Sequence, residues 1–381
     1  MTKIIVVTPN YPSKKRPERG AFVENLVNSW RSQGEKVSVI NPRSIFSPDE
    51  VRFKPHITDN GKENYLCVGS YLSFSNIKIG PMSTGTLSRK LFQKCAFKCY
   101  NFIKPELPYF FYGKFLMTGG GAAAKLSEVT SVPAFVDLGE SNLAGNMSRA
   151  ETKEARGIVS KLSGAVCVSN RLREEAISLG FSADDVLLCP NFPDLDRFYS
   201  LSNKAKVRRQ LGIPLDKFVV IFAGHFIERK GPKRVLAAIE RARDDVCGIF
   251  LGQGPESVSG DRVLFSGPVK PEEVNLWLNA ADVFMLPTTA EGHCNAINEA
   301  MAAGLPIITS SIRDVDAQVN ERNSIRVDPY DVDGMANAIN ELQADKLLRE
   351  SMSKSSRDFI LAKKNHNRES VILQWIREKI N

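Results

Sequence analysis

Two glutamates eight positions apart, Glu291 and Glu299, lie around the start of a predicted helix. The first precedes the helix and the second lies inside it, so we expect their carboxylates at different depths of one cleft. A carboxylate accepts hydrogen bonds from adjacent hydroxyl groups, which suits a sugar for one glutamate and a ribose diol for the other. The alternative is that Glu291 only caps the helix and that Glu299 is a solvated helix residue.

The same stretch places backbone amides at the end of a strand. The apolar run 283–286 predicts a strand, and residues 295–303 predict a helix. The helix therefore begins at the carboxyl end of a parallel strand. Unpaired amides around His293, Cys294 and Asn295 can bind a phosphate or a sugar hydroxyl there.

A basic pair, Arg229 and Lys230, follows the apolar run 218–223 and precedes Gly231, where a second helix is expected to begin. A cation beside helix-end amides makes a site for a diphosphate. Taken alone, such a pair is more often solvated surface. Its position close to a domain boundary, in the same domain as the two glutamates, favours the diphosphate site.

Strands alternate with helices in both halves of the chain. In the first half, a strand over 3–8 is followed by a polar loop over 9–20, a helix over 21–33 and a strand over 37–40. This alternation is typical of parallel βαβ units, so the fold class is α/β with a doubly wound sheet in each half. The first helix is expected to bury one stripe, formed by Phe22, Val23, Leu26, Val27 and Trp30.

The length of 381 residues predicts two domains. The prolines between 190 and 193 and the absence of a sustained period favour a join between 192 and 203. We expect a first domain over 1–195 and a second over 196–359, with a C-terminal helix over about 360–381 that packs back on the first. The glycine run 119–121 predicts a tight approach between backbone segments.

Composition excludes several classes of protein. With 43% hydrophobic and 25% charged residues, the chain is neither disordered nor fibrous. The seven cysteines are odd in number and form no CxxC pair, so we expect reduced, buried thiols and no metal site. No signal peptide precedes the first strand, and no apolar run approaches the ~20 residues of a membrane-spanning helix. These features predict a cytoplasmic protein.

At this point the chain resembles the GT-B glycosyltransferases and, within them, the large retaining family 4, which uses sugar nucleotides. The resemblance covers nearly the whole chain and is strongest over 166–311. The five matching motifs stand in the family's order: an E-x7-E motif at 291–299, a G-R-x4-K-G loop at 224–231, and shorter segments at 168–170 with 190–198, at 252–255 and at 263–267.

The resemblance implies two Rossmann-like domains that face a central cleft, the first for the acceptor and the second for the nucleotide-sugar donor. It also implies that no metal or other cofactor is needed, because positive side chains and helix amides neutralise the leaving diphosphate. Lys230 would contact that diphosphate, Glu299 would hold the ribose hydroxyls, and Glu291 would bind the sugar on the face opposite the reaction.

Further contacts are implied by the same resemblance. Backbone groups near Val269 and Lys270 would meet the base. The amides from His293 through Cys294 to Asn295 would meet the sugar and its phosphate. Gly20, in the first domain, would approach the diphosphate.

Two departures from the family pattern matter. The phosphate-binding arginine after the first glycine is His225 here, and Arg229 is the candidate to replace its charge. The family's acceptor-side histidine has no counterpart, so we propose Glu140 for that role, with Asp137 as second choice. Glu140 would then be catalytic together with Glu291 and Lys230. The alternative is that Glu140 only caps the segment that follows it.

We therefore expect a retaining hexosyltransferase that works by front-face attack, in which the departing diphosphate takes the proton and two closing domains exclude water. The expected donor is a UDP-sugar, and the expected acceptor is a glycan or lipid-linked oligosaccharide of a bacterial O-antigen, capsule or exopolysaccharide. The alternatives are a GDP-mannose-dependent mannosyltransferase, an epimerase or phosphorylase of the same fold, and a non-catalytic sugar-binding protein. Nucleic-acid binding is not expected, since no basic motif interleaved with aromatics occurs.

The net charge of +8 is unevenly distributed. Residues 1–125 contain 19 Lys and Arg against 8 Asp and Glu, whereas the rest contains 32 against 35. We expect this basic part to bind an anionic membrane surface, so that the protein is peripheral on the cytoplasmic face of the inner membrane. The alternative is a solvated basic face. Two clusters carry the charge: Lys14, Lys15, Arg16 and Arg19 in the first loop, and Arg89, Lys90, Lys94 and Lys98 among Leu87, Leu91, Phe92 and Phe97.

Overall fold

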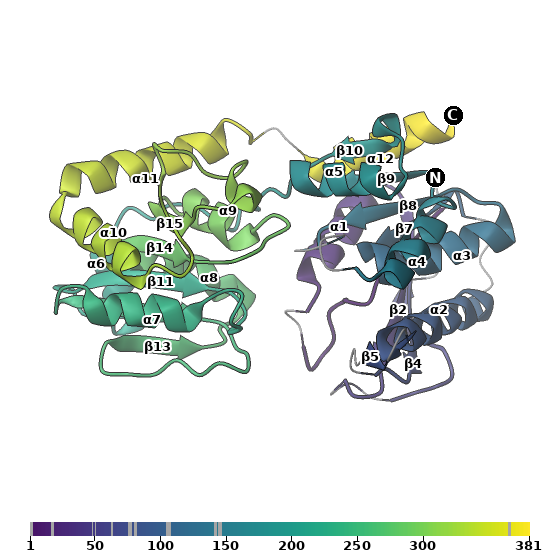
Figure 1. Ribbon diagram of the computed structural model, residues 1–381, viewed down its shortest axis with the longest axis horizontal. Helices are drawn as coiled ribbons and strands as arrows, with labels where there is room; N and C mark the ends of the chain where they lie inside the picture. Colours follow the sequence, from purple (N-terminus) through teal and green to yellow (C-terminus); the bar gives the residue numbers. More distant parts are fainter. Residues whose placement is uncertain are drawn as a thin grey trace. The chain divides into compact units, whose positions relative to one another are not determined.

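The computed structural model describes residues 3–16, 19–47, 49, 51–61, 64–74, 78–79, 82–103, 108–140, 143, 147–364 and 367–381. The chain divides into two compact units (Figure 1). Unit 1 comprises residues 1–190 and 367–381, and unit 2 comprises residues 191–366. The first change of unit thus falls a few residues before the predicted boundary at 195, and the second falls at 366/367.

Unit 1 is built on a sheet that has eight strands within the described residues, in the order β10-β9-β8-β7-β1-β2-β4-β3. Neighbouring strands run parallel, except that β3 pairs antiparallel with β4 at one edge. The strands are β1 (Lys3–Val7), β2 (Lys36–Ser44), β3 (His56–Gly61), β4 (Asn64–Tyr71), β7 (Phe110–Lys114), β8 (Ala134–Leu138), β9 (Gly164–Cys167) and β10 (Val186–Leu188), beside a separate pair, β5 (Lys78–Ile79) and β6 (Met82–Ser83).

Helices cover both faces of this sheet. In β1, Ile4 and Val6 join the core under α1 and α12, whereas Ile5 and Val7 join the core under α2 and α3. Parallel strands with helices on both faces are expected to be apolar throughout, as β1 is. The helices are α1 (Ala21–Ser32), α2 (Thr84–Ile103), α3 (Gly121–Thr130), α4 (Arg149–Val159), α5 (Asn170–Leu179) and α12 (Arg368–Ile380), with a π-helix, η1 (Phe115–Gly120), and a 3₁₀ turn, η2 (Ala183–Asp185).

The glycine run 119–121 lets η1 pack directly on the sheet. A Cβ atom at Gly119 would lie 2.3 Å from the carbonyl oxygen of Val7 and 2.4 Å from that of Lys114, so only glycine fits. The predicted close approach of backbone segments is confirmed. Phe115, the first residue of η1, has φ of 66°, which is uncommon for a residue with a side chain.

Unit 2 is built on a parallel sheet in the order β13-β12-β11-β14-β15-β16. Its strands are β11 (Phe218–Ala223), β12 (Val246–Leu251), β13 (Val263–Gly267), β14 (Val283–Leu286), β15 (Ile307–Ser310) and β16 (Ser324–Val327). Its helices are α6 (Lys204–Leu211), α7 (Pro232–Arg241), α8 (Val274–Ala280), α9 (Asn295–Ala302), α10 (Val332–Ala344) and α11 (Lys346–Leu361), with 3₁₀ turns η3 (Pro271–Glu273) and η4 (Arg313–Val315).

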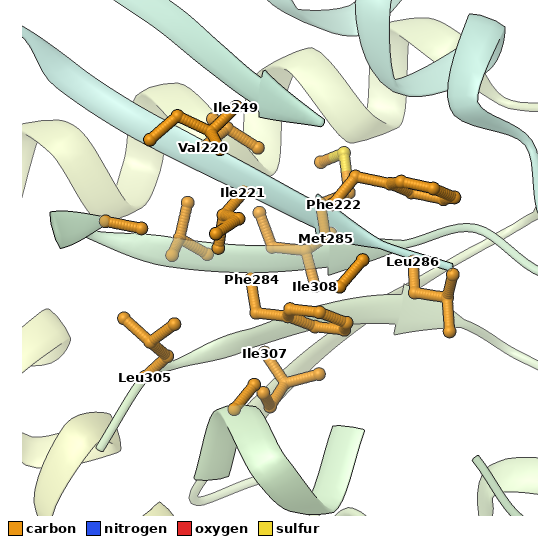
Figure 2. Close-up of a cluster of buried hydrophobic side chains, with 14 of the residues drawn as sticks. Val220, Ile221, Phe222, Ile249, Phe284, Met285, Leu286, Leu305, Ile307 and Ile308 are labelled. Carbon is orange, nitrogen blue, oxygen red and sulfur yellow. The ribbon is translucent and has the colours of Figure 1, made fainter. Parts of the chain in front are cut away.

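The central strands of unit 2 bury every side chain. Consecutive residues of β11, β14 and β15 point to opposite faces of the sheet and still pack into one apolar core, as Figure 2 shows for Ile221, Phe222 and Phe284. Because neither face can accept a charged group, polar chemistry in this unit is restricted to the ends of the strands.

A buried ion cluster attaches the end of the chain to unit 1. Asp137 on β8 is 1% exposed, and its carboxylate accepts hydrogen bonds from Lys114 Nζ at 2.6 Å, Tyr112 Oη at 2.9 Å and Arg368 Nη2 at 3.1 Å. Burial favours the neutral acid, but Arg368 and Lys114 hold the pKa of Asp137 below its usual range. Arg368 also donates to the carbonyl of Cys189 at 3.0 Å.

The helix α12 packs back on unit 1 beside α1 (Figure 1). Its side chains Ile372, Leu373 and Ile376 are buried, and Trp30 Nε1 donates to the carbonyl of Glu369 at 2.8 Å. The predicted single helix over about 360–381 is wrong in its first part, since α11 ends at Leu361 and α12 begins only at residue 368.

The stripe predicted for α1 is correct except at its first residue. Val23, Leu26, Val27 and Trp30 are buried, whereas Phe22 is 41% exposed. Phe22 lies next to the strained Phe115, with ring centroids 6.3 Å apart, instead of in the core.

The apolar face of α2 does not face outward, as a helix lying on a membrane would require. Phe92 is 1% exposed and packs in the core with Phe97, because this face covers β2 and β4. Arg89 forms an ion pair with Glu154 at 2.7 Å. The prediction of a membrane-surface helix is therefore wrong for α2, and its exposed lysines form a solvated basic face.

Two predictions made from composition can be compared directly with the structure. All seven cysteines are free and buried, as predicted. In the part of the chain that the structure describes, no helix combines the length and apolarity needed to cross a bilayer.

The ion cluster at Asp137 predicts a large loss of stability when its cation from α12 is removed. Replacing Arg368 with methionine leaves the buried Asp137 with one cation among the described residues, Lys114. We expect the free energy of unfolding of unit 1 to fall by about 3–5 kcal/mol, the usual cost of breaking a buried ion pair.

The measurement is urea unfolding followed by tryptophan fluorescence in a Trp277→Phe background, where both remaining tryptophans lie in unit 1. The control is Lys379→Met on the same helix, whose partner Asp185 is partly exposed. That pair should contribute no more than about 1 kcal/mol. Equal losses in the two variants would contradict the prediction.

Candidate active site

The two predicted motifs lie on adjacent strands of unit 2. The loop over 224–231 follows β11, and the loop over 287–294 follows β14. The chain leaves β11 toward β12 on one side and returns at β14 on the other, so the sheet order reverses between them. Ligands of open parallel sheets bind at the carboxyl ends of strands at such a reversal.

A carboxylate and two cations meet between these loops. Glu291 Oε1 lies 2.5 Å from Lys230 Nζ and 3.2 Å from Arg229 Nη1, and it accepts a hydrogen bond from Thr288 Oγ1 at 2.8 Å. Glu291 is buried, whereas Arg229 keeps 32% of its side chain exposed. The site thus has a buried carboxylate with a cation pair that still reaches solvent.

The environment of Lys230 keeps it charged. Burial lowers the pKa of this ammonium, but Cys294 and Glu291 more than compensate and raise the pKa above its usual value. The two loops are also joined through the backbone, since the amide of Thr289 donates to the carbonyl of Arg229 at 2.9 Å. The position of the ammonium is therefore fixed by both loops.

The alternative of Glu291 as a helix cap does not hold. The N-cap position of α9 is occupied by Cys294, three residues after Glu291. The Glu291 carboxylate is directed toward the cations, and its own amide donates to Asp314 Oδ2 at 2.7 Å.

One of the three predicted amides is already occupied. The Cys294 amide donates to Gln318 Oε1 at 2.8 Å, and Gln318 Nε2 donates to the Cys294 carbonyl at 2.8 Å. The amide of Cys294 is thus held by the side chain of Gln318, which is 1% exposed, and is not available to a ligand in this structure. This corrects the prediction for Cys294.

A network of amide side chains fixes the start of α9. Asn298 Nδ2 lies 3.0 Å from His293 Nε2 and 3.1 Å from the carbonyl of Asn191, while its Oδ1 accepts from Gln318 Nε2 at 3.0 Å. Asn295 Oδ1 accepts from Asn191 Nδ2 at 3.0 Å. The predicted residues His293 and Asn295 are therefore held at the helix start by neighbours.

Glu299 lies on α9, eight residues after Glu291. It is half-buried, and in the described chain no ion-pair partner contacts it; Arg197 acts on it only from a distance. Burial raises the pKa of Glu299 to about 7, and the charge of Arg197 opposes this shift. Glu299 is therefore not a fully solvated helix residue.

The remaining predicted donor-side residues are more exposed. His225 is exposed and Val269 is half-buried, while Lys270 is exposed and begins the turn η3. The Lys270 amide donates to Glu273 Oε2 at 3.2 Å. The structure brings Arg229, Lys230 and Glu291 together by direct contact. His225 lies on the same loop as Arg229, whereas Val269 and Lys270 lie on the loop after β13.

In unit 1, Gly20 is the N-terminal cap of α1, with φ of 75°. A Cβ atom here would lie 2.5 Å from the carbonyl carbon of Asn10. Gly20 is thus required by its backbone conformation and by the packing of the loop between β1 and α1. This packing accounts for the glycine without a ligand.

The two acceptor-side candidates have different environments. Asp137 belongs to the ion cluster under α12, so we withdraw it as an acceptor-side group. Glu140 Oε1 accepts from the Leu116 amide at 2.5 Å, and its Oε2 is buried with no hydrogen-bond partner among the described residues. Burial raises the pKa of Glu140 to about 7, although the Leu116 amide opposes this.

Glu140 therefore caps η1, which precedes it in the chain. The alternative, a cap of the segment that follows, falls on residues 141–146, most of which lie outside the described residues. Because one carboxyl oxygen lacks a partner, the residue retains a group that can bind a ligand. Lys114 is the last residue of β7, and its ammonium lies 5.1 Å from the centre of the Phe22 ring.

The sequence did not reveal several residues that form hydrogen bonds with the loop around Glu291 and Cys294. Thr288 lies inside the motif and could have been identified as a polar residue beside Glu291. Gln318 and Asp314 come from the segment after β15, 24 and 23 residues beyond their partners, and carry no local pattern. Only the fold brings them to the loop.

Comparisons with known proteins show what this chain is similar to. Residues 217–345 match the family model described as glycosyl transferases group 1. Over 356 residues, 91% of this chain and 90% of the relative, the chain is 27% identical to TuaC of Bacillus subtilis, whose name assigns it to teichuronic acid biosynthesis. It is 29% identical over 230 residues, 56% of this chain and 61% of the relative, to the lipopolysaccharide core biosynthesis glycosyltransferase LpsE of Rhizobium meliloti.

Solved structures share the fold over the full length. The sucrose-phosphate synthase of Thermosynechococcus elongatus has a TM-score of 0.76 at 19% identity, covering 99% of this chain and 98% of that one. Anabaena HepE has a TM-score of 0.69 at 17% identity, covering 100% and 99%. The chain is therefore a glycosyltransferase with the GT-B fold, and the group 1 family match lies in unit 2.

Proposed function

We propose that this enzyme is a retaining, family 4-like hexosyltransferase. It transfers a hexosyl unit from a nucleotide sugar to a hydroxyl of a glycan or lipid-linked oligosaccharide in bacterial surface polysaccharide synthesis. The observation that carries the proposal is the contact of Glu291 with Lys230 and Arg229 at the switch point of unit 2. The names of TuaC and LpsE, both tied to surface polysaccharides, support the class of product.

We propose a UDP-sugar as the donor. In support, solved structures of HepE contain UDP, UDP with glucose, and UDP-glucose, although at 16–17% identity they share only the fold with this chain. GDP-mannose is the competing donor. A thermal-shift panel of UDP, GDP and ADP with their sugars distinguishes them, because the nucleotide that binds stabilises the fold by mass action.

The cations of the site can stabilise a diphosphate as the leaving group. Lys230 and Arg229 place two cations beside the start of α7, where they can neutralise the negative charge that grows on the leaving group. Glu291 accepts hydrogen bonds from sugar hydroxyls on the face opposite the reaction. With the acceptor hydroxyl entering on the same face as the leaving group, the diphosphate oxygen takes the hydroxyl proton and configuration is retained.

We propose that this charge neutralisation proceeds without a metal ion. Within the described residues, no group of three or more His, Cys, Asp or Glu side chains is arranged to hold a metal. Transfer activity that is unchanged after treatment with EDTA would support the proposal, and activity restored by added Mg²⁺ or Mn²⁺ would overturn it.

The reaction class is tested by the dependence of UDP release on an acceptor. A transferase releases UDP from UDP-glucose in proportion to an added glycan acceptor. An epimerase converts the sugar without releasing UDP, and a sugar-binding protein releases none. We also propose that the reaction takes place at the cytoplasmic face of the membrane, where activity should sediment with vesicles that carry the lipid-linked acceptor.

Removing the ammonium of Lys230 should weaken donor binding. In Lys230→Ala we expect the dissociation constant for UDP, measured by calorimetry, to rise at least about tenfold, because a buried charge contact of about 1.4 kcal/mol or more is lost. The control is Lys233→Ala, an exposed lysine on α7 with the same change of charge, which should bind UDP as the wild type does. Unchanged affinity in Lys230→Ala would contradict the diphosphate role.

Glu299 should make donor binding depend on pH. Its pKa is about 7 in the free protein, so the carboxylate that accepts the ribose hydroxyls predominates only above that pH. We expect affinity for UDP-glucose to increase up to about tenfold from pH 6 to pH 8, since binding favours the ionised form. UDP-glucose is chosen because its diphosphate does not titrate in this range. In Glu299→Gln the profile should be flat, and an unchanged slope would assign the titration to another group.

Glu140 should act on transfer and not on donor affinity. In Glu140→Gln the amide oxygen still accepts from Leu116, so η1 keeps its cap while the ionisable group is lost. At saturating donor we expect the transfer rate to fall about 100-fold and to lose its rise through pH 7, because the ionised carboxylate no longer orients the acceptor hydroxyl for attack. The dissociation constant for UDP-glucose should stay unchanged. A rate and pH profile like those of the wild type would leave Glu140 with a capping role alone.

A further inference from the structure

A cavity of about 740 Å³ lies in unit 1, next to the loop between β1 and α1. Its walls come from that loop, from α1, from the end of β2, from the edge strand β3 and from its neighbour β4. This volume falls in the range of sites for small ligands. The lining residues that matter below are Lys14, Lys15, Glu24, Arg43, Arg52 and Thr58.

Two lysines at the cavity have no partner within the described chain. Lys14 and Lys15 are exposed, and no described carboxylate lies within ion-pair distance of either. They follow Pro12 in the loop, and the carbonyl of Pro12 accepts from Arg43 Nη2 at 3.2 Å. The loop that carries the free lysines is thus attached to the end of β2.

The wall contributed by β2 is also positively charged. Arg16 Nη2 lies 3.7 Å from Asp49 and Arg43 Nη1 lies 3.8 Å from it, so two guanidinium groups share one carboxylate at the outer limit of ion pairing. Burial lowers the pKa of Arg43, and repulsion from Arg16 adds to this although Asp49 opposes it. An anion entering the cavity would relieve this repulsion.

The backbone of Arg52 is fixed beside the cavity. Its amide donates to Ser70 Oγ at 2.9 Å, and its carbonyl accepts from the Ser70 amide at 2.8 Å. Ser70 lies at the end of β4, so Arg52 stands at the same sheet edge as Arg43. The cations therefore come from three different segments that the fold brings to one hollow.

The other lining groups favour a sugar over a bare anion. Glu24 on α1 and Thr58 on β3 offer oxygen atoms that accept hydrogen bonds from hydroxyls. Leu66 and Val68 form an apolar wall, as the nonpolar face of a sugar ring requires. A flat lipid headgroup surface would need no hollow of this kind.

We infer that this cavity binds an anionic glycan, a sugar chain with a carboxylate or phosphate group, as part of the acceptor. The inference rests on the proposed function and deepens it, because it assigns the acceptor to a chemical class. The anionic group lies against Lys14, Lys15, Arg43 and Arg52, and the neutral hydroxyls lie against Glu24 and Thr58.

The test is calorimetric binding of a soluble glucuronic acid tetrasaccharide to the full chain at 0.15 M salt. The neutral glucose tetrasaccharide serves as the control ligand. The wild type should bind the acidic chain and not the neutral one. In Lys14→Ala/Lys15→Ala we expect the dissociation constant to rise about tenfold, which corresponds to about 1.4 kcal/mol.

The matched control is Lys90→Ala/Lys94→Ala, two exposed lysines on α2, which covers the opposite face of the sheet. This variant should bind the acidic tetrasaccharide as the wild type does. Equal losses in both double variants, or equal binding of the acidic and neutral chains, would overturn the inference. The inference would also be overturned if binding to phosphatidylglycerol vesicles required Lys14 and Lys15 while binding to the tetrasaccharide did not.

The outcome is separable from that of the proposed function. UDP binding by Lys14→Ala/Lys15→Ala tests only unit 2 and should equal that of the wild type. If UDP binds and the acidic glycan does not, the acceptor class is wrong and the transferase proposal stands. If UDP does not bind to the wild type, the proposed function itself fails.

Discussion

The large sheet of each unit is covered by helices on both faces, and this constraint determines where chemistry can occur. In unit 2 the strands β11, β14 and β15 bury consecutive apolar side chains, so no charged group can stand on either face. Charged groups must gather at the strand ends. Lys230 and Glu291 meet there. In unit 1, Glu140 and the basic cavity lie at two separate places near strand ends.

The parts of the site that could be predicted are formed by short, contiguous segments of the sequence. Lys230 and Glu291 each follow a buried strand and precede a helix, so pattern and spacing were sufficient to predict that they lie together at the strand ends. Gln318 and Arg368 could not be predicted in this way. Each acts on a partner far along the chain, and a contact of that kind depends on the sheet order, which local periodicity does not specify.

Local patterns also failed where they could not tell which apolar residue reaches the core. Phe22 matches the helical stripe of α1 but is exposed, and the apolar face of α2 faces the sheet and not a membrane. Charge counting had a similar limit. Arg89 is neutralised by Glu154, whereas Lys14 has no such partner in the described chain. Two residues with the same formal charge therefore differ in how readily they can bind an anion.

The ion cluster under α12 also has a consequence for synthesis on the ribosome. Domains generally fold in the order in which they emerge. Here Asp137 and Trp30 receive Arg368 and Glu369 only after the whole of unit 2 has been translated. Unit 2 can therefore complete its core first, while in unit 1 the part of the sheet face that lies beside α1 stays exposed until α12 is made. A chaperone that shields this face would serve the first half of the chain, not the second.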